Sequence, residues 1–224
     1  MDSRDNNQNG IILICVIVNL GQGSRAMQTA KHNGIRGGTV FYGEGTVKNR
    51  ILEFLALSEV KKEVVLLFAE RETAYKALEA LKEELKLHKP NHGIAFTTSI
   101  AEVIGSKAYD HFNGLKERGG DSMSMYQAIT TIVDRGKAEE VIKAAESAGS
   151  KGGTVIRARG SGIHDTRKIF SMEIEPEKEI VLVLAKNDMV HAITSAINEK
   201  LKMDEPGNGI IFIQDVEKTV GLIE

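Results

Sequence analysis

The segment GIRGGTV at residues 34–40 recurs almost unchanged as GSKGGTV at residues 149–155, which is 115 positions further along the chain (149 minus 34). Two more segments repeat in the same order: KEVVL at 62–66 returns as KEIVL at 178–182, and PNHGIAF at 90–96 returns as PGNGIIF at 206–212. These later pairs are 116 positions apart (178 minus 62), so one single-residue indel separates the copies. A period above about a hundred residues indicates a duplicated domain rather than a solenoid. The sequence therefore predicts two like domains, residues 1–115 and 116–224.

Composition is that of an ordinary soluble globular protein, with 42% hydrophobic and 27% charged residues in a chain of 224. The net charge of −2 argues against nucleic acid or an anionic membrane as a partner, because both attract clustered positive charge. Cys15 is the only cysteine, which excludes an intramolecular disulfide and a cysteine-based metal cluster. Its place in the apolar run 11–18 predicts a buried, unreactive thiol.

Residues 1–10 are polar and lack the apolar core of a signal peptide. The longest apolar run, residues 11–18, is too short to span a bilayer. We therefore expect a cytoplasmic protein without membrane insertion.

The hydrophobic pattern predicts the order βαββαβ in each copy. In copy one, Ser24 is a candidate helix N-cap, and Gly34 stands where a left-handed residue would end the helix. The expected elements of copy one are 11–18, 24–33, 37–42, 61–69, 73–87 and 93–97, and those of copy two are 125–133, 137–148, 153–158, 179–185, 189–201 and 209–213. This order predicts an α+β fold of two tandem ferredoxin-like domains, each with two helices on one face of an antiparallel sheet.

The helix-free face of such a sheet is apolar here, and the sister copy or other subunits must cover it. Oligomerisation is therefore expected. Residues 47–60 and 163–177, between the second and third strands, carry apolar residues that favour a short hairpin extension packed on a neighbour. Residues 106–124 have the composition of a linker, and residues 101–108 are compatible with a tail of the first copy.

The shoulder of this connection in copy two is rich in cations and glycines. Glycines on both sides of a serine let backbone N–H groups approach an anion, and neighbouring guanidinium groups can neutralise its charge. Copy one has only EGTV at 44–47 in the matching place. The candidate anion-binding residues in copy two are Arg157, Arg159, Gly160, Ser161, Gly162 and Arg167.

A βαββαβ unit that carries GGTV at 152–155, ARGSG at 158–162, IEPEKEIV at 174–181 and GNGIIF at 207–212 resembles the P-II family of nitrogen-regulatory signal proteins. The resemblance covers about a hundred residues of copy two and, less sharply, a similar span of copy one. It is greatest to the divergent members in which the connection between strands two and three is short.

The resemblance implies trimers that bind adenine nucleotides, often with 2-oxoglutarate, in clefts between subunits. Gly160 and Gly162 match the family's Gly-x-Gly at the loop base. Gly207, Asn208 and Gly209 match its Gly-Asp-Gly. Departures from the family pattern are Ile210 in place of a phosphate-binding lysine, Asn208 in place of aspartate, no Arg-Thr-Gly-Glu segment, and no long loop with a tyrosine that is modified.

Other sites receive less support. GQGSRA at 21–26 fits a dinucleotide fingerprint, but its counterpart in copy two does not, and a βαββαβ order lacks the parallel sheet that this fingerprint serves. The six histidines show no paired ligand spacing, so no metal site is assigned. His92 and His164 are the candidate ligands if the protein is a metal-binding trimer. No catalytic arrangement of side chains is readable from the residue order.

The sequence thus predicts a non-enzymatic P-II-like regulatory protein that assembles as a homo-oligomer or trimer-like complex. It senses a small anionic effector, for which an adenine nucleotide is one candidate, and regulates an unidentified protein partner. No cofactor is assigned with certainty. Two alternatives stay open: a scaffold or partner-binding module without a ligand, and a metal-binding trimer of similar fold.

Overall fold

The computed structural model describes residues 10–46, 59–105, 125–161, 168–169, 172–173 and 175–219. They form two compact units. The first consists of Met1–Thr98 together with Ala158–Ile163, and the second of Ser99–Arg157 together with His164–Glu224. The predicted domain boundary near residue 115 lies between 105 and 125, outside the described residues, and stays a prediction.

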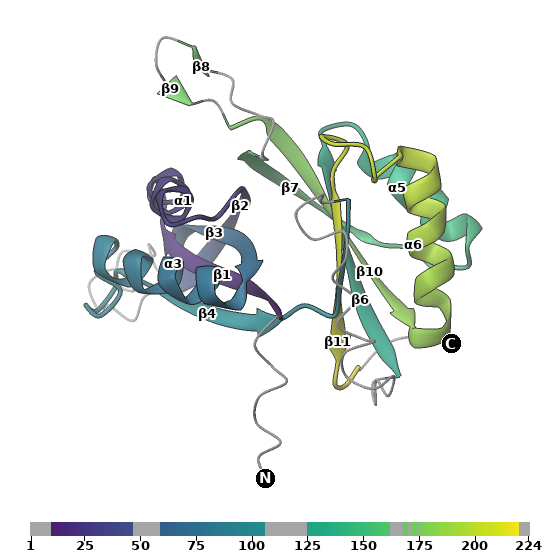
Figure 1. The fold of residues 1–224 in the computed structure, drawn as a ribbon, viewed down its shortest axis with the longest axis horizontal. Helices are drawn as coiled ribbons and strands as arrows, with labels where there is room; N and C mark the ends of the chain where they lie inside the picture. The colour runs from purple at the N-terminus through teal and green to yellow at the C-terminus, as the bar shows by residue number, and fades with distance from the viewer. Residues whose placement is uncertain are drawn as a thin grey trace. The chain divides into compact units, whose positions relative to one another are not determined.

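The first unit has the predicted order βαββαβ (Figure 1). Its sheet runs in the order β4-β1-β3-β2, and both β1 and β2 pair antiparallel with β3. This is the strand order of the ferredoxin-like fold, so the predicted fold class is confirmed for copy one. The elements are β1 (Ile11–Asn19), α1 (Gly23–His32), β2 (Gly38–Thr46), β3 (Glu59–Glu70), α3 (Arg71–Glu84) and β4 (Gly93–Ser99).

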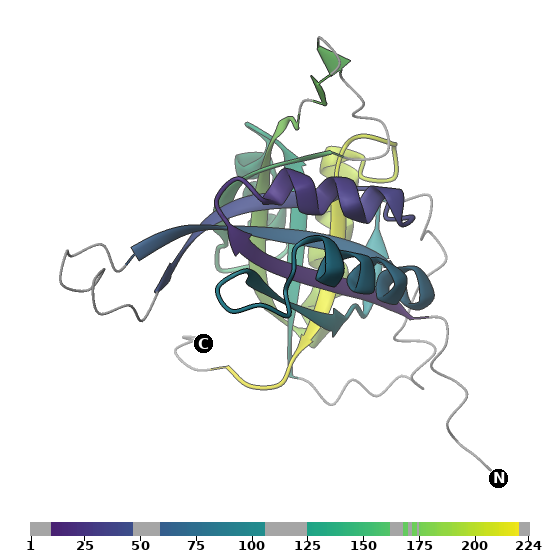
Figure 2. The ribbon, with the colours of Figure 1, turned by 90° about the vertical axis from the view of Figure 1, so that its left-hand side faces the viewer.

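The core of the first unit lies between its two helices and one face of its sheet (Figure 2). Alternate residues of β1 point into this core, and both helices contribute small alanines that allow close packing on the strands. The other residues of β1, among them Leu13 and Ile17, face the side without helices, which is therefore apolar as predicted. The core residues include Ile12, Ile14, Val16, Val18, Ala26, Met27, Ala30, Ala74, Ala77 and Leu81.

The second unit repeats the arrangement. Its sheet runs β7-β10-β6-β11-β5, so the first four strands correspond to β2, β3, β1 and β4 of the first unit. Helices α5 and α6 pack together on one face, where Ile129, Val181 and Ile193 are fully buried (Figure 1). The elements are β6 (Tyr126–Asp134), α5 (Ala138–Ser147), β7 (Thr154–Ser161, whose last four residues belong to the first unit), β10 (Glu177–Lys186), α6 (Asn187–Leu201) and β11 (Ile210–Val216).

Strand β5 (Glu102–Ile104) is an addition that the repeat did not predict. It pairs antiparallel with β11, with Val103 opposite Phe212, and the N–H of Ala101 donates to the carbonyl oxygen of Ile213 at 2.8 Å. Residues 101–104 therefore pair with the sheet of the second unit and cluster with that unit. The physical reason is that β11 offers unpaired backbone groups, which a preceding strand can satisfy.

A two-stranded hairpin stands in the connection that follows β7. Strand β8 (Lys168–Ile169) pairs with β9 (Met172–Glu173), with Lys168 opposite Glu173. A hairpin in this segment of copy two agrees with the sequence prediction. The counterpart in copy one, residues 47–58, lies outside the described residues.

The duplication extends to rare backbone conformations. Lys86 and Lys202, equivalent residues that follow the second helix of each unit, have φ angles of 54° and 52°. A non-glycine residue seldom adopts a positive φ, so the same conformation at both positions indicates one shared backbone design. Gly34, with a φ of 95°, follows α1 in the left-handed conformation that the sequence predicts.

Cys15 is buried in β1, with 7% of its surface exposed, and burial raises the pKa of its thiol. Both observations agree with the prediction of an unreactive cysteine. Among the described helices, none combines the length and the apolar character needed to cross a bilayer.

Candidate functional site

Each unit holds the turn before its first helix with a glutamate from its third strand. In the first unit, the N–H of Gly23 donates to Glu63 Oε2 at 2.6 Å. In the second, Glu179 Oε2 accepts from the N–H groups of Gly136 and Ala138 at 3.0 and 2.9 Å. A carboxylate at a helix N-terminus satisfies unpaired N–H groups and interacts favourably with the helix dipole.

This arrangement corrects the prediction that Ser24 caps the first helix. Helix α1 begins at Gly23, and its N-cap residue Gln22 makes no side-chain capping bond. The capping charge comes instead from β3, 40 positions away in the chain. The side chain of Glu63 is only 3% exposed, which places an ionisable group in the interior of the unit.

Arg159 neutralises this carboxylate. Its Nη2 lies 2.7 Å from Glu63 Oε1, and its Nη1 donates to Ser24 Oγ at 3.0 Å. Arg159 is 22% exposed and stands in the part of β7 that belongs to the first unit. Because the carboxylate is nearly buried, its pairing with a guanidinium group offsets the loss of its hydration.

Gly160, the next predicted site residue, has a structural reason to be glycine. Its backbone lies so close to β2 that an added Cβ atom would stand 2.4 Å from the carbonyl oxygen of Gly38. Strand β2 pairs there with Ala158–Ser161, with Gly38 opposite Ser161 and Val40 opposite Arg159. Arg157 is exposed, whereas Gly162 and Arg167 lie outside the described residues.

The predicted glycine loop before the last strand also has a structural role. Gly209 has a φ of 138°, and a Cβ atom there would stand 2.4 Å from the carbonyl oxygen of Ile132. Its equivalent Gly93 has a φ of 133° and meets the carbonyl oxygen of Ile17 at the same 2.4 Å. Both glycines therefore permit the close approach of the loop to the first strand of the unit.

The other two members of this loop are exposed or half-buried. Gly207 adopts a φ of 96° with open space around it, and Asn208 Nδ2 donates to the carbonyl oxygen of Lys202 at 2.9 Å. The predicted set is divided between the units: Arg159, Gly160 and Ser161 belong to the first, and Arg157 with residues 207–209 to the second. Its role in binding a ligand stays a prediction.

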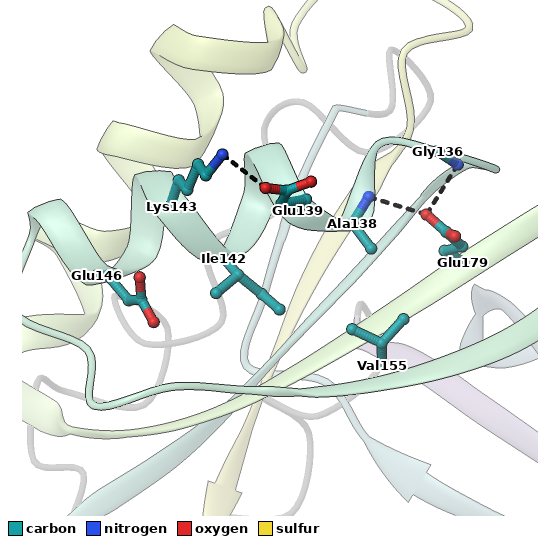
Figure 3. Close-up of a pocket in the computed structure, with 8 residues that line it drawn as sticks. All are labelled: Gly136, Ala138, Glu139, Ile142, Lys143, Glu146, Val155 and Glu179. Carbon is teal, nitrogen blue, oxygen red and sulfur yellow. Dashed lines mark hydrogen bonds and ion pairs between the residues drawn. The ribbon is translucent and has the colours of Figure 1, made fainter.

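A shallow cleft of about 510 Å³ lies in the second unit, between α5 and β7 (Figure 3). Ile142 and Val155 project into it from the helix and the strand, and Glu179 closes one end. Three glutamates and one lysine give its lining a negative charge. The lining residues are Gly136, Ala138, Glu139, Ile142, Lys143, Glu146, Val155 and Glu179.

Ion pairs made by the lining residues or by their neighbours in sequence are solvent-exposed. Lys143 Nζ lies 2.6 Å from Glu139 Oε1, and this hydrogen bond lowers the pKa of Glu139 and raises that of Lys143. Arg135 pairs with Glu177 at 2.5 Å, which raises the pKa of Arg135, and the charge of Glu179 contributes to the same shift. Such exposed pairs fix charges in place without contributing much stability.

The sequence did not identify Glu63, Glu179 or the cleft as functional features. The available signal was the KE pair repeated at 62–63 and 178–179, which marked a strand but not the role of its acidic residue. Among the described residues, no group of three His, Cys, Asp or Glu side chains has the geometry to hold a metal ion. His92, one of the two histidines singled out, has its Nδ1 atom 3.2 Å from the carbonyl oxygen of Leu85, and His164 lies outside the described residues.

The family model that matches this chain covers residues of the second unit. The model of the family "Nitrogen regulatory protein P-II" matches residues 126–222. The nitrogen regulatory protein P-II of Cereibacter sphaeroides is 32% identical over 98 residues, which cover 41% of this chain and 87% of that protein. The nitrogen regulatory protein P-II 1 of Methanothermobacter thermautotrophicus is 30% identical over 100 residues, covering 42% and 86%. A crystal structure of Arabidopsis thaliana PII bound to citrate matches at 24% identity and a TM-score of 0.34, over 42% of this chain and 79% of that one.

Proposed function

Because the chain belongs to the nitrogen regulatory protein P-II family through its second unit, we propose that it is a non-enzymatic signal protein that senses a small anionic effector and regulates a protein partner. The observation that carries the proposal is the family match over residues 126–222, which includes the segment RARGSG at 157–162. Two guanidinium groups and two glycines in six residues are suited to an anion.

Arg157 is the member of this segment that is free to meet an effector from solvent. It is exposed and has no polar partner among the described residues. An anion bound there would gain a charge-assisted hydrogen bond without displacing one that already exists. We therefore assign Arg157 the first contact with the effector, with Gly162 and Arg167 as further proposed contacts.

An effector that binds Arg159 would compete with Glu63, because the guanidinium group already pairs with that carboxylate, and the arginine could exchange one partner for the other. Such an exchange would leave the carboxylate of Glu63 without its neutralising charge at the start of α1. Effector binding at Arg159 is thereby coupled to the first unit, which is the kind of change that a signal protein passes to a partner.

Adenine nucleotides are the effector class to test first, since the resemblance to the family points to them. Calorimetric titration of the full chain with ATP, ADP, AMP and cyclic nucleotides provides the measurement. We expect binding by at least one of them, weakened about tenfold in Arg157→Ala, as loss of one charge-assisted contact predicts. Lys200→Ala, which removes a cation on α6, is the matched control and should bind like the unaltered protein.

Absence of binding by all four classes of nucleotide to the folded protein would remove the nucleotide proposal. Equal weakening in Arg157→Ala and Lys200→Ala would show that the affinity reflects overall charge rather than this segment. Titration with 2-oxoglutarate and inorganic phosphate in the same series separates a different anionic effector from no effector.

A scaffold without a ligand is the second candidate function, and one observation favours it. Arg159, Gly160 and Gly209 each make contacts that maintain the fold, so they have a reason to be present in the absence of any effector. Thermal unfolding distinguishes the two functions: an effector raises the melting temperature of a sensor in proportion to its concentration, whereas a scaffold shows no shift with any ligand.

Assembly is part of the proposal for either function. The helix-free face of the first sheet exposes apolar side chains on β4, where Ile94 and Phe96, which flank the core-facing Ala95, are 60% and 47% exposed. Apolar sheet faces require cover, and a homo-oligomer of trimer-like form is the assembly expected of this family. Sedimentation equilibrium of the purified chain measures the number of subunits; a monomer across the concentration range would contradict it.

A further inference from the structure

The cleft of the second unit is lined by residues that correspond, in the repeat, to those around Arg159 in the first unit. Gly136, Ala138, Glu139 and Val155 lie 115 positions after Gly21, Gly23, Ser24 and Val40, and Glu179 lies 116 positions after Glu63. In the first unit, Ser24 and Glu63 bind the guanidinium group of Arg159, and Val40 is the residue opposite Arg159 in β2.

The cleft carries more negative charge than the site around Arg159 in the first unit, so it is better suited to bind a cation. Glu139 replaces the serine hydroxyl of Ser24 with a carboxylate, although Lys143 shares its charge at 2.6 Å. Glu179 uses one oxygen to hold the N–H groups of Gly136 and Ala138, as Glu63 does for Gly23. Its second oxygen, equivalent to the one that binds Arg159, accepts no hydrogen bond from the described residues.

The walls of the cleft suit the stem of a long side chain. Val155 is 43% exposed, and Ile142 faces the same space from α5 (Figure 3). Aliphatic carbons of an arginine can lie along these two side chains while its planar group bridges the carboxylates. Copy one has Glu44 at the position that corresponds to Arg159, so the repeat itself supplies no arginine for this cleft.

We propose that the cleft binds an arginine side chain that an extended segment of a protein partner presents. An extended segment is inferred because the arginine of the first unit comes from residues 158–161, which pair as a strand with β2. The inference is independent of the proposed effector, because it concerns a cationic partner at α5 and not an anion at the arginines of β7.

Titration of the isotope-labelled full chain with the peptide acetyl-Ala-Arg-Gly-Ser-amide, which copies residues 158–161, tests the proposal. The backbone N–H signals of Gly136, Ala138 and Val155 should shift in a saturable way. The same peptide with lysine should bind about fivefold more weakly, because an ammonium group cannot bridge two carboxylates as a guanidinium fork does. Arginine amide should also bind more weakly, because it lacks the extended backbone.

Variants locate the site. Glu179→Gln should weaken binding of the arginine peptide about tenfold, since it removes the half-buried carboxylate that corresponds to Glu63. Glu139→Gln, on an exposed helix position, should weaken binding of the arginine peptide about threefold. It tests the site independently if the loss of Glu179 disturbs the start of α5. Glu205→Gln removes an exposed carboxylate outside the cleft and should leave the affinity unchanged.

Four results would each overturn the proposal. They are the absence of saturable shifts at the cleft, equal affinity for the lysine peptide, an equal loss in Glu205→Gln and Glu179→Gln, and arginine amide that binds as tightly as the peptide. The last would indicate a free guanidinium ligand in place of a polypeptide.

Discussion

Glu63 and Arg159 form an ion pair with 2.7 Å between Oε1 and Nη2, although 96 positions separate them in the chain. The other oxygen of Glu63 receives the N–H of Gly23 at the start of α1. One carboxylate thus connects a helix N-terminus, strand β3 and the end of β7 within the first unit. The stability of this unit should therefore depend on a residue that lies far along the sequence.

Arg159→Ala should lower the free energy of unfolding by about 2–3 kcal/mol, because it leaves a nearly buried carboxylate without its counter-charge. Urea denaturation in the absence of any ligand measures the change. Arg157→Ala, two residues away and exposed, is the matched control and should change stability by less than about 0.5 kcal/mol. Equal effects of the two substitutions would mean that the ion pair contributes nothing beyond surface charge.

Gly160→Ala should destabilise the protein by about 1–3 kcal/mol, because its methyl group would stand 2.4 Å from the carbonyl oxygen of Gly38. Gly43→Ala in β2 is the control, since a Cβ atom there meets its nearest neighbour, Val64, at an ordinary 3.7 Å. Thermal unfolding without ligand compares them. An unaltered melting temperature for Gly160→Ala would leave ligand binding as the only reason for this glycine.

Gly209→Ala and Gly93→Ala test whether the duplicated loops share one structural requirement. Each methyl group would stand 2.4 Å from a backbone carbonyl oxygen, so we expect losses of about 2–4 kcal/mol that agree within about 1 kcal/mol of each other. At Gly207 an added methyl group would meet no neighbour, so Gly207→Ala should lose only about 1 kcal/mol of stability, from the strain of a positive φ. Urea denaturation provides the three values; similar losses at Gly207 and Gly209 would contradict the steric account.

The fold was predictable from the sequence because the two copies supported each other. The repeated glycine segments and apolar strands indicated the order βαββαβ twice, and the observed strand orders agree. Strand β5 was not predicted, because the three residues 102–104 are too few to carry a periodic pattern and their pairing with β11 depends on the folded sheet.

The site was less predictable, because a sequence shows a charge but not its partner. Arg159 was assigned to an anion, and the carboxylate of Glu63 provides such an anion within the same chain. Ser24 stands close to the start of α1, yet Glu63 reaches the helix from β3 and takes the capping role. Both relations depend on the distance between strands and turns, which residue order alone does not contain.

Glu102→Gln should stabilise the protein at neutral pH. Burial in β5 raises the pKa of the Glu102 carboxyl, an effect that the charge of His191 partly opposes. Because the folded state holds this proton more tightly than the unfolded state, ionisation of Glu102 destabilises the fold as pH rises through the carboxyl range. The gain from glutamine should therefore be present at pH 7 and absent at pH 3, where glutamate is protonated in both states. Urea denaturation at the two pH values measures it, and a gain of equal size at both would point to a cause other than ionisation.

Guanidinium should restore stability to Arg159→Ala if the pocket around Glu63 selects a planar cation. The substitution removes the side chain but retains Glu63, Ser24 and the N–H of Gly23 that defines the orientation of the carboxylate. Millimolar guanidinium, far below denaturing concentration, can then occupy the vacated position and raise the melting temperature of the variant by mass action. The same concentration of ammonium is the ionic control, and the unaltered protein, whose own Arg159 fills the place, should gain nothing from either salt. Equal shifts with guanidinium and ammonium would show that Glu63 recognises charge alone, and a double variant with Glu63→Gln should lose the response altogether.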